Sequence, residues 1–275
     1  MPFRWRTVTE LASDDGTVQP LTRTVRPLDR ACLRVIVIGL GAVLSSFCVT
    51  FWRSPGTAMA FLSLSLPTWL FLSGTLWRAR ALLGPRATRL GGATHLTVLR
   101  GLLVSLVAGF VWVPPVGAVR WFPAILYAAA AVGDRFDGII ARRLGQTTLL
   151  GAWLDEATDA LGLLVAPAVA VSWGRLPPLY LLVGAAYYVF HAAIWLHRRL
   201  GLPVYLERVK PKRVTRIFAG LQMTLVSVAL APLLSLEITT AAATLLMIPT
   251  LILFGRDWLI AIGRLPPPRP ATAAR

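Results

Sequence analysis

The sequence predicts an all-α fold, a polytopic helical bundle in a membrane, and three features carry this prediction. Hydrophobic residues make up 56% of the 275 residues and charged residues 15%, whereas a soluble domain carries roughly a quarter charged residues. The mean hydropathy is +0.67. The apolar residues gather in long stretches, and about 20 such residues suffice to cross a bilayer as a helix. The composition therefore excludes an ordinary soluble enzyme.

Eight apolar stretches of this length follow one another, separated by Arg, Pro and Gly residues that end one helix and start the next. We expect transmembrane helices near 33–52, 57–77, 94–113, 119–141, 151–173, 179–197, 214–234 and 238–258. An even number of crossings places both termini on the same side of the membrane.

The basic residues predict which side this is. The chain has 28 Lys and Arg against 12 Asp and Glu, a net charge of +16. With the N-terminus inside, only Arg53, Arg120 and Arg175 fall on outer turns, which leaves 25 of the 28 at the inner face. This asymmetry is the positive-inside pattern. It predicts an integral membrane protein with cytoplasmic N- and C-termini, and it indicates the lipid bilayer, not nucleic acid, as the partner of the basic charge.

The polar N-terminal segment, residues 1–32, has neither the apolar run of a cleaved secretory signal nor a clear periodicity. We expect a cytoplasmic arm there. Residues 33–91 are expected to form two additional transmembrane helices and a basic inner loop, and residues 261–275 a cytoplasmic tail. No chemistry is assigned to these segments, so residues 92–260 are left to carry the function.

Acidic side chains are concentrated in the middle of that region. Five of the 12 acidic residues lie between Asp134 and Asp159, and carboxylates inside membrane helices are costly and usually functional. Asp134 and Asp137 share one face of a helix, and Asp155 and Asp159 share one face of the next. Because the two helices are consecutive and antiparallel, we expect the four carboxylates to meet near the cytoplasmic surface.

Four carboxylates at one point repel one another unless some are protonated or a cation lies between them. Oxygen ligands without His or Cys nearby favour Mg²⁺ or Mn²⁺. Gly138, Ala141 and Gly151 leave space for a ligand to approach the helix backbone, and Arg142 offers a guanidinium to a phosphate. The residues thus predict a site for a metal-bound pyrophosphate.

A purely structural alternative pairs these aspartates with Arg135, Arg142 and Arg143. Such pairs explain neither the small residues nor the regular spacing, so the functional interpretation is favoured. Glu156 points about 100° away from Asp155 on an ideal helix, and we expect it to pair with an arginine.

The pattern resembles the signature of the CDP-alcohol phosphatidyltransferases, integral membrane enzymes of phospholipid synthesis. That signature reads D-x-x-D-G-x-x-A-R, eight further residues, then G-x-x-x-D-x-x-x-D. All its fixed positions are matched, by Asp134, Asp137, Gly138, Ala141, Arg142, Gly151, Asp155 and Asp159. The resemblance implies a six-helix catalytic core over residues 92–260, with the first two helices as an addition.

The resemblance also implies an activity, the transfer of a phosphatidyl group from a CDP-linked lipid such as CDP-diacylglycerol to an alcohol, with release of CMP. It implies one or two metal ions held by Asp134, Asp137, Asp155 and Asp159, with Asp159 also acting as the catalytic base. It implies a CDP cradle formed by Asp137, Gly138, Ala141, Arg142 and Gly151. Finally, it implies a homodimer, unless the two additional helices cover the surface that a second copy would use.

A weaker match precedes the signature. The segment from Thr94 to Arg100 is similar to the first core helix of the family, which often reads P-N-x-L-T-x-x-R, although Ala93 and Thr94 replace the Pro-Asn. Thr97 and Arg100 are therefore candidates on the nucleotide side of the site.

A basic cluster opens the helix expected over 214–234. Lys212, Arg213 and Arg216 form either a pocket for an anionic acceptor, such as glycerol 3-phosphate or inositol phosphate, or positive-inside charge against anionic lipid. The Lys212-x-x-Thr215 spacing is similar to that of family members that use glycerol phosphate, which favours the pocket. The Arg-Glu pair that those members often carry on the preceding helix is absent, which favours the lipid contact.

Other classes also use intramembrane aspartates. An intramembrane prenyltransferase is disfavoured because its two aspartate-rich motifs are separated by several helices. A cation transporter needs a polar path to both faces, and the outer halves of the two aspartate-bearing helices have no acidic residue. An inactive scaffold is disfavoured because the signature is complete.

Overall fold

The computed structural model describes residues 27–83, 89–143, 148–206 and 213–266, and within these ranges the chain is helical without β-strands. Eight α-helices coincide one by one with the eight predicted stretches, which confirms the all-α bundle. They are α1 Pro27–Arg53, α2 Pro55–Ala79, α3 Gly92–Ala108, α4 Phe122–Arg143, α5 Leu149–Ser172, α6 Leu181–Arg199, α7 Arg213–Leu230 and α8 Leu236–Ala261.

The first helix begins at Pro27, inside the segment that was expected to be a polar arm. Proline at the first helical position and an acidic residue in the first turn, here Asp29, both favour a helix start. Arg80, just after α2, also pairs with Asp29 at 2.9 Å. The rest of the expected arm, residues 1–26, lies outside the described residues.

Five of the helices in the described ranges are long and apolar enough to cross a membrane by themselves, namely those within 27–53, 55–82, 92–112, 178–199 and 236–261. The apolar part of α7 is shorter, Ile217–Leu230. The helices α4 and α5 carry the charged signature residues and are not among these five. The chain is therefore an integral membrane protein.

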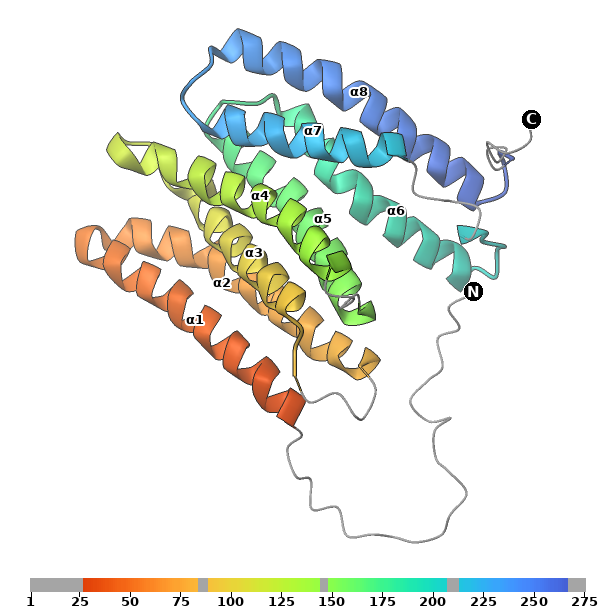
Figure 1. Ribbon diagram of the computed structural model, residues 1–275. Helices are drawn as coiled ribbons and strands as arrows, with labels where there is room; N and C mark the ends of the chain where they lie inside the picture. Colours follow the sequence, from red (N-terminus) through yellow and green to blue (C-terminus); the bar gives the residue numbers. More distant parts are fainter. Residues whose placement is uncertain (1–26, 84–88, 144–147, 207–212, 267–275) are drawn as a thin grey trace, which may run out of the picture.

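The helices run alternately up and down (Figure 1), and short turns with the expected Pro and Gly residues join α1 to α2, α3 to α4 and α5 to α6. Ser54 accepts the backbone N–H of Thr57 and so caps α2, with Pro55 as its first residue. Gly117 and Gly174 adopt positive φ angles of 53° and 66° in two other turns, a conformation that glycine tolerates best. We call the opposite end of the bundle, where α4 ends and α5 begins, the signature end.

The helix α3 packs against both α4 and α5, and α5 also contacts α2, α6 and α7. In Figure 1, α1 and α2 lie on one side of this central group, and α7 and α8 on the other. The larger hydrophobic core joins α3, α4, α5 and α7. This arrangement places α3 in contact with both helices of the signature.

A second hydrophobic core fixes the two additional helices to the others. Cys32 of α1, Trp69 and Leu76 of α2, Val98 of α3 and Leu154 of α5 belong to it. The Trp69 indole N–H donates to the backbone oxygen of Ile36 at 3.2 Å. The ring lies directly over Gly39, where a Cβ would overlap it. The first two helices are thus packed against the core and are not loosely attached.

Candidate active site

The structure describes the side chains of three of the four signature aspartates, and these three side chains converge. One carboxylate oxygen from each of Asp134 on α4 and Asp155 and Asp159 on α5 lies within 4.8 Å of the other two. The side chains are 33%, 39% and 32% exposed. The four-residue spacing places the two aspartates of α5 on one face, one turn apart. The predicted meeting of the two helices' acids is therefore observed for these three.

A buried arginine from α3 completes the cluster. The Arg100 side chain is 3% exposed and donates to Asp155 Oδ1 at 2.5 Å and to Asp159 Oδ1. The same guanidinium lies 3.2 Å from Asp134 Oδ1. Its Nε donates to the backbone oxygen of Ala130 on α4 at 3.1 Å. Arg100 thus links α3 to both signature helices.

The donor set of this cluster fits a divalent metal ion. All three groups are carboxylates, so the ligands are hard oxygens of the kind that Mg²⁺ and Mn²⁺ prefer. The contacts to Arg100 use one oxygen of each carboxylate. Among the described side chains of the cluster, three carboxylates face one guanidinium, which leaves an excess of negative charge. A divalent cation would compensate that excess.

The rest of the predicted CDP cradle is described only in part. The helix α4 includes Asp137, Gly138, Ala141 and Arg142, but their side-chain environment lies outside the described residues. Gly151 is described in the first turn of α5, where its N–H donates to the hydroxyl of Thr148 at 3.0 Å.

A Cβ at Gly151 would lie 3.1 Å from the Thr148 hydroxyl and 3.7 Å from that of Thr94. A Cβ at Gly151 would therefore crowd the hydroxyl that caps its own helix and make an ordinary contact with Thr94 of α3.

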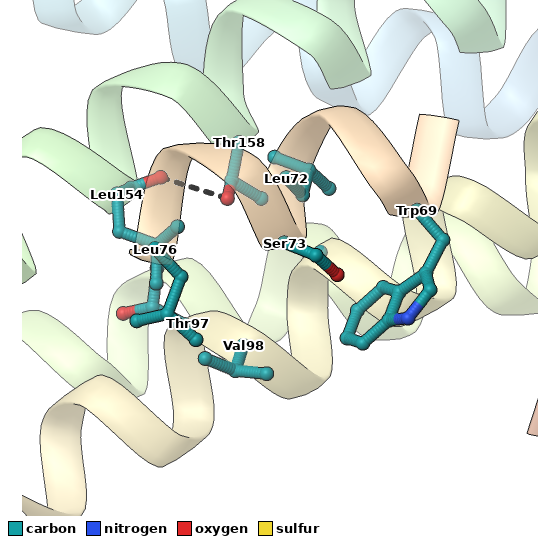
Figure 2. A pocket seen from close by; sticks show the side chains of 9 residues that line it. Trp69, Leu72, Ser73, Leu76, Thr97, Val98, Leu154 and Thr158 are labelled. Atoms are coloured by element: carbon teal, nitrogen blue, oxygen red, sulfur yellow. Dashed lines mark hydrogen bonds between the residues drawn. The ribbon is translucent and has the colours of Figure 1, made fainter. Parts of the chain in front are cut away.

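The structure describes both candidates of the first core helix. Arg100 reaches the carboxylates, and Thr97 is buried and donates its hydroxyl to the backbone oxygen of Ala93 at 3.1 Å. Figure 2 shows Thr97 lining a cavity of about 10 Å³ between α2, α3 and α5, together with Trp69, Leu72, Ser73, Leu76, Val98, Leu154 and Thr158. Arg100 is thus a residue of α3 that contacts the three described aspartates.

The predicted acceptor residues are mostly outside the described structure. Lys212 is not among the described residues. Arg213 and Arg216 lie in the first turn of α7, and their side chains are not described. The helix α7 packs against α4 and α5 and begins at the signature end (Figure 1). The backbone of Arg213 and Arg216 therefore lies at the same end of the bundle as the aspartates.

Glu156 lies apart from the aspartate cluster, but the expectation that it pairs with an arginine was wrong. Its Oε1 accepts the hydroxyl of Tyr187 at 2.9 Å and lies 3.8 Å from Nε2 of His191. These groups line a groove of about 620 Å³ between α2, α5 and α6. The reason is that this face of α5 turns toward α6, whereas the signature arginines belong to α4.

Two residues of α4 at this site were not foreseen from the sequence. Gly133 faces the stem of Arg100, since a Cβ there would lie 3.0 Å from its Cγ. Tyr127 is 2% exposed, and its hydroxyl has no hydrogen-bond partner within the described ranges. It lines a cavity of about 10 Å³ with Arg100 and Asp159. The glycine directly before the signature was the available signal, and nothing in the sequence singled out Tyr127.

Comparison with known proteins agrees with this geometry. Over 100 residues, the chain is 31% identical to the CDP-diacylglycerol–glycerol-3-phosphate 3-phosphatidyltransferase of Wigglesworthia glossinidia brevipalpis, covering 34% of this chain and 54% of that protein. Over 92 residues, it is 34% identical to the protein of the same name from Escherichia coli K12, covering 30% of this chain and 48% of that protein. The chain thus spans about half the length of these curated relatives. Residues 92–262 match the CDP-alcohol phosphatidyltransferase family, and the chain belongs to that family.

Proposed function

We propose that this protein transfers a phosphatidyl group from CDP-diacylglycerol to an alcohol and releases CMP. The observation that carries the proposal is the convergence of Asp134, Asp155 and Asp159 within the region that matches the family. A cluster of carboxylates in a membrane bundle is energetically costly and usually marks a functional site. Phosphoryl transfer from a pyrophosphate is a function that uses such a cluster, because it requires cations at the reacting groups.

The proposed metal ligands are Asp134, Asp137, Asp155 and Asp159, and the proposed ion is Mg²⁺ or Mn²⁺. A bound divalent ion would offset the negative charge of the pyrophosphate and of the departing CMP. Gly138, Ala141, Arg142 and Gly151 are proposed, with Asp137, to bind the CDP moiety.

The reaction is a substitution at the phosphorus that carries diacylglycerol. The acceptor oxygen forms a bond to this phosphorus, the bond from phosphorus to the bridging oxygen breaks, and CMP leaves with that oxygen. Asp159 is proposed to take the proton of the acceptor hydroxyl. Its Oδ1 is held by Arg100, so the second carboxylate oxygen is the one proposed to face the hydroxyl. A positioned base of this kind contributes about 10²–10⁴-fold.

Glycerol 3-phosphate is the proposed acceptor. The names of the relatives from Wigglesworthia and Escherichia coli include it, and the basic residues Lys212, Arg213 and Arg216 are proposed to bind its phosphate. Inositol phosphate remains the second candidate, because the same cations suit any phosphorylated alcohol.

The active site is proposed to face the cytoplasm, with both termini on that side. The excess of arginine at the signature end supports this orientation, and it gives the nucleotide of the lipid donor access from the cytosol. The catalytic core is proposed to span residues 92–260. A homodimer stays a prediction of the family resemblance, and light scattering on the purified protein tests it.

The direct test is an acceptor panel with the purified full-length chain in lipid vesicles. We expect CMP release from CDP-diacylglycerol that requires Mg²⁺ or Mn²⁺ and is fastest with glycerol 3-phosphate. Inositol, inositol phosphate and serine serve as the comparison acceptors. If no acceptor gives metal-dependent CMP release above that of vesicles without the protein, the proposed transferase activity is refuted. A preference for inositol phosphate would change the proposed acceptor but leave the proposed reaction, phosphatidyl transfer, unchanged.

A further inference from the structure

We propose that Arg100 is a resident counter-ion of the aspartate cluster, which stabilises the bundle without metal and weakens the binding of a divalent ion. The inference rests on the proposed function, since it takes the three carboxylates as metal ligands. It is an alternative to the prediction that Arg100 lies on the nucleotide side of the site. The role is one of positioning and charge balance, because Arg100 acts through Asp134, Asp155 and Asp159.

The fold holds the Arg100 guanidinium in place from several sides. Its stem crosses α4 at Gly133, where a Cβ would lie 3.0 Å from Cγ and 3.2 Å from Cδ. Its Nε is fixed by the backbone oxygen of Ala130 at 3.1 Å. A guanidinium that is 3% exposed and anchored at its stem has little freedom to turn away. Arg100 is therefore part of the interior of the bundle and not a surface residue that happens to lie near acids.

Charge balance gives the arginine two opposite effects. Without it, three carboxylates whose oxygens lie within 4.8 Å would repel one another between α4 and α5, and this repulsion opposes folding. A divalent ion at the same carboxylates, however, meets the positive charge of Arg100 at close range. Coulomb repulsion at such distances is large in a partly buried site. The same side chain thus favours the metal-free bundle and disfavours the loaded one.

A competing account makes Arg100 a mere organiser of the ligands. In that account, its hydrogen bonds bring the carboxylates together for the metal, so its removal weakens metal binding. The counter-ion account gives the opposite sign, because removal of one positive charge strengthens the attraction of the cluster for a dication. The direction of the change in metal affinity therefore separates the two accounts.

The experiment measures Mn²⁺ binding to the purified full chain in micelles, without lipid donor or acceptor, from the electron paramagnetic resonance of free Mn²⁺. We expect Arg100→Gln to bind Mn²⁺ about 10-fold more tightly than the unaltered protein, or more. Its unfolding temperature in chelator falls, and saturating Mn²⁺ raises that temperature more than in the unaltered protein. Arg100→Lys, which keeps the charge, leaves the affinity within about two-fold.

Two further variants keep the test decisive if Arg100→Gln does not fold. Gly133→Ala touches no charged group but pushes the Arg100 stem aside, so we expect tighter Mn²⁺ binding by a smaller factor. Arg135→Gln removes an exposed guanidinium next to Asp134 and, because solvent screens that charge, changes the affinity less than two-fold.

Unchanged or weaker binding in both Arg100→Gln and Gly133→Ala would overturn the counter-ion role. If the unaltered protein binds no Mn²⁺ at all, the proposed metal site itself fails. If it binds Mn²⁺ and releases CMP while the variants show no tighter binding, only the counter-ion proposal fails.

Discussion

The close contact between α5 and α6 at Gly184 predicts a large effect from a single added methyl group. A Cβ at this position would lie 2.7 Å from the Cα of Leu164 and closer still to the backbone oxygen of Leu163. Both obstacles are backbone atoms of a helix, so no side chain can rotate away. Since carbon atoms in contact are normally about 3.5–4.0 Å apart, Gly184→Ala must separate the two helices by roughly 1 Å.

The size of the effect follows from two opposing contributions. Overpacking of a tight interface costs about 1–3 kcal/mol, and the backbone clash puts this position near the upper value. Alanine in a helix gains about 0.5–1 kcal/mol over glycine. The net expectation for Gly184→Ala is a loss of about 2 kcal/mol, which corresponds to roughly 4–8 °C in unfolding temperature for a domain of this size.

Gly74 provides the matched control, because it lies in the interior of α2 with no atom within 4 Å of an added Cβ. Gly74→Ala should therefore be neutral or stabilising by up to about 1 kcal/mol. Thermal unfolding of both variants in the same detergent measures the difference. Equal unfolding temperatures would refute the inferred close packing of α5 and α6, and with it the position given to the helix that carries Asp155 and Asp159.

Three further changes test other parts of the structure. Arg175 donates to three backbone oxygens at and after the end of α7, at 3.1, 3.3 and 2.7 Å, so Arg175→Ala should lower stability by about 2 kcal/mol; an unchanged unfolding temperature would contradict this. The double change Lys212→Ala and Arg213→Ala should raise KM for a phosphorylated acceptor with little change in kcat, and an unaltered KM would favour the lipid-contact interpretation of these residues. Asp159→Asn should lower turnover by about 100-fold or more while the protein stays folded, and retained turnover would remove Asp159 from the base role.

The helices of this protein were predictable because each is a long apolar stretch bounded by Pro, Gly or Arg. The facing of Asp134, Asp155 and Asp159 was predictable for a related reason, since helical spacing fixes which residues share a face. Local chain geometry thus determined both results. The start of α1 was not predicted, because Pro27 and Asp29 begin this helix in a polar segment, where hydropathy carries no signal.

What the sequence could not show depends on which helices are neighbours. The acids of the two signature helices meet as expected, but the contribution of α3, which packs against both helices and brings Arg100 to the cluster, was not predictable. The partners of Glu156 were not predicted for the same reason, because tertiary packing determines which face of α5 meets α6. The contribution of Gly133 was hidden as well, since a glycine's use depends on the side chain that lies over it.

Two neighbouring residues of α5 test whether the convergent carboxylates of α4 and α5 carry metal-dependent phosphatidyl transfer. Asp155 lies in the cluster, whereas Glu156 points into the groove with Tyr187. Both are replaced by their amides, and CMP release from CDP-diacylglycerol is measured over a range of Mn²⁺ concentrations. The account predicts that Asp155→Asn lowers the rate by about 100-fold or more and raises the Mn²⁺ requirement, while Glu156→Gln stays within about two-fold of the unaltered protein. Equal rates in the two variants, or full activity in Asp155→Asn, would contradict it.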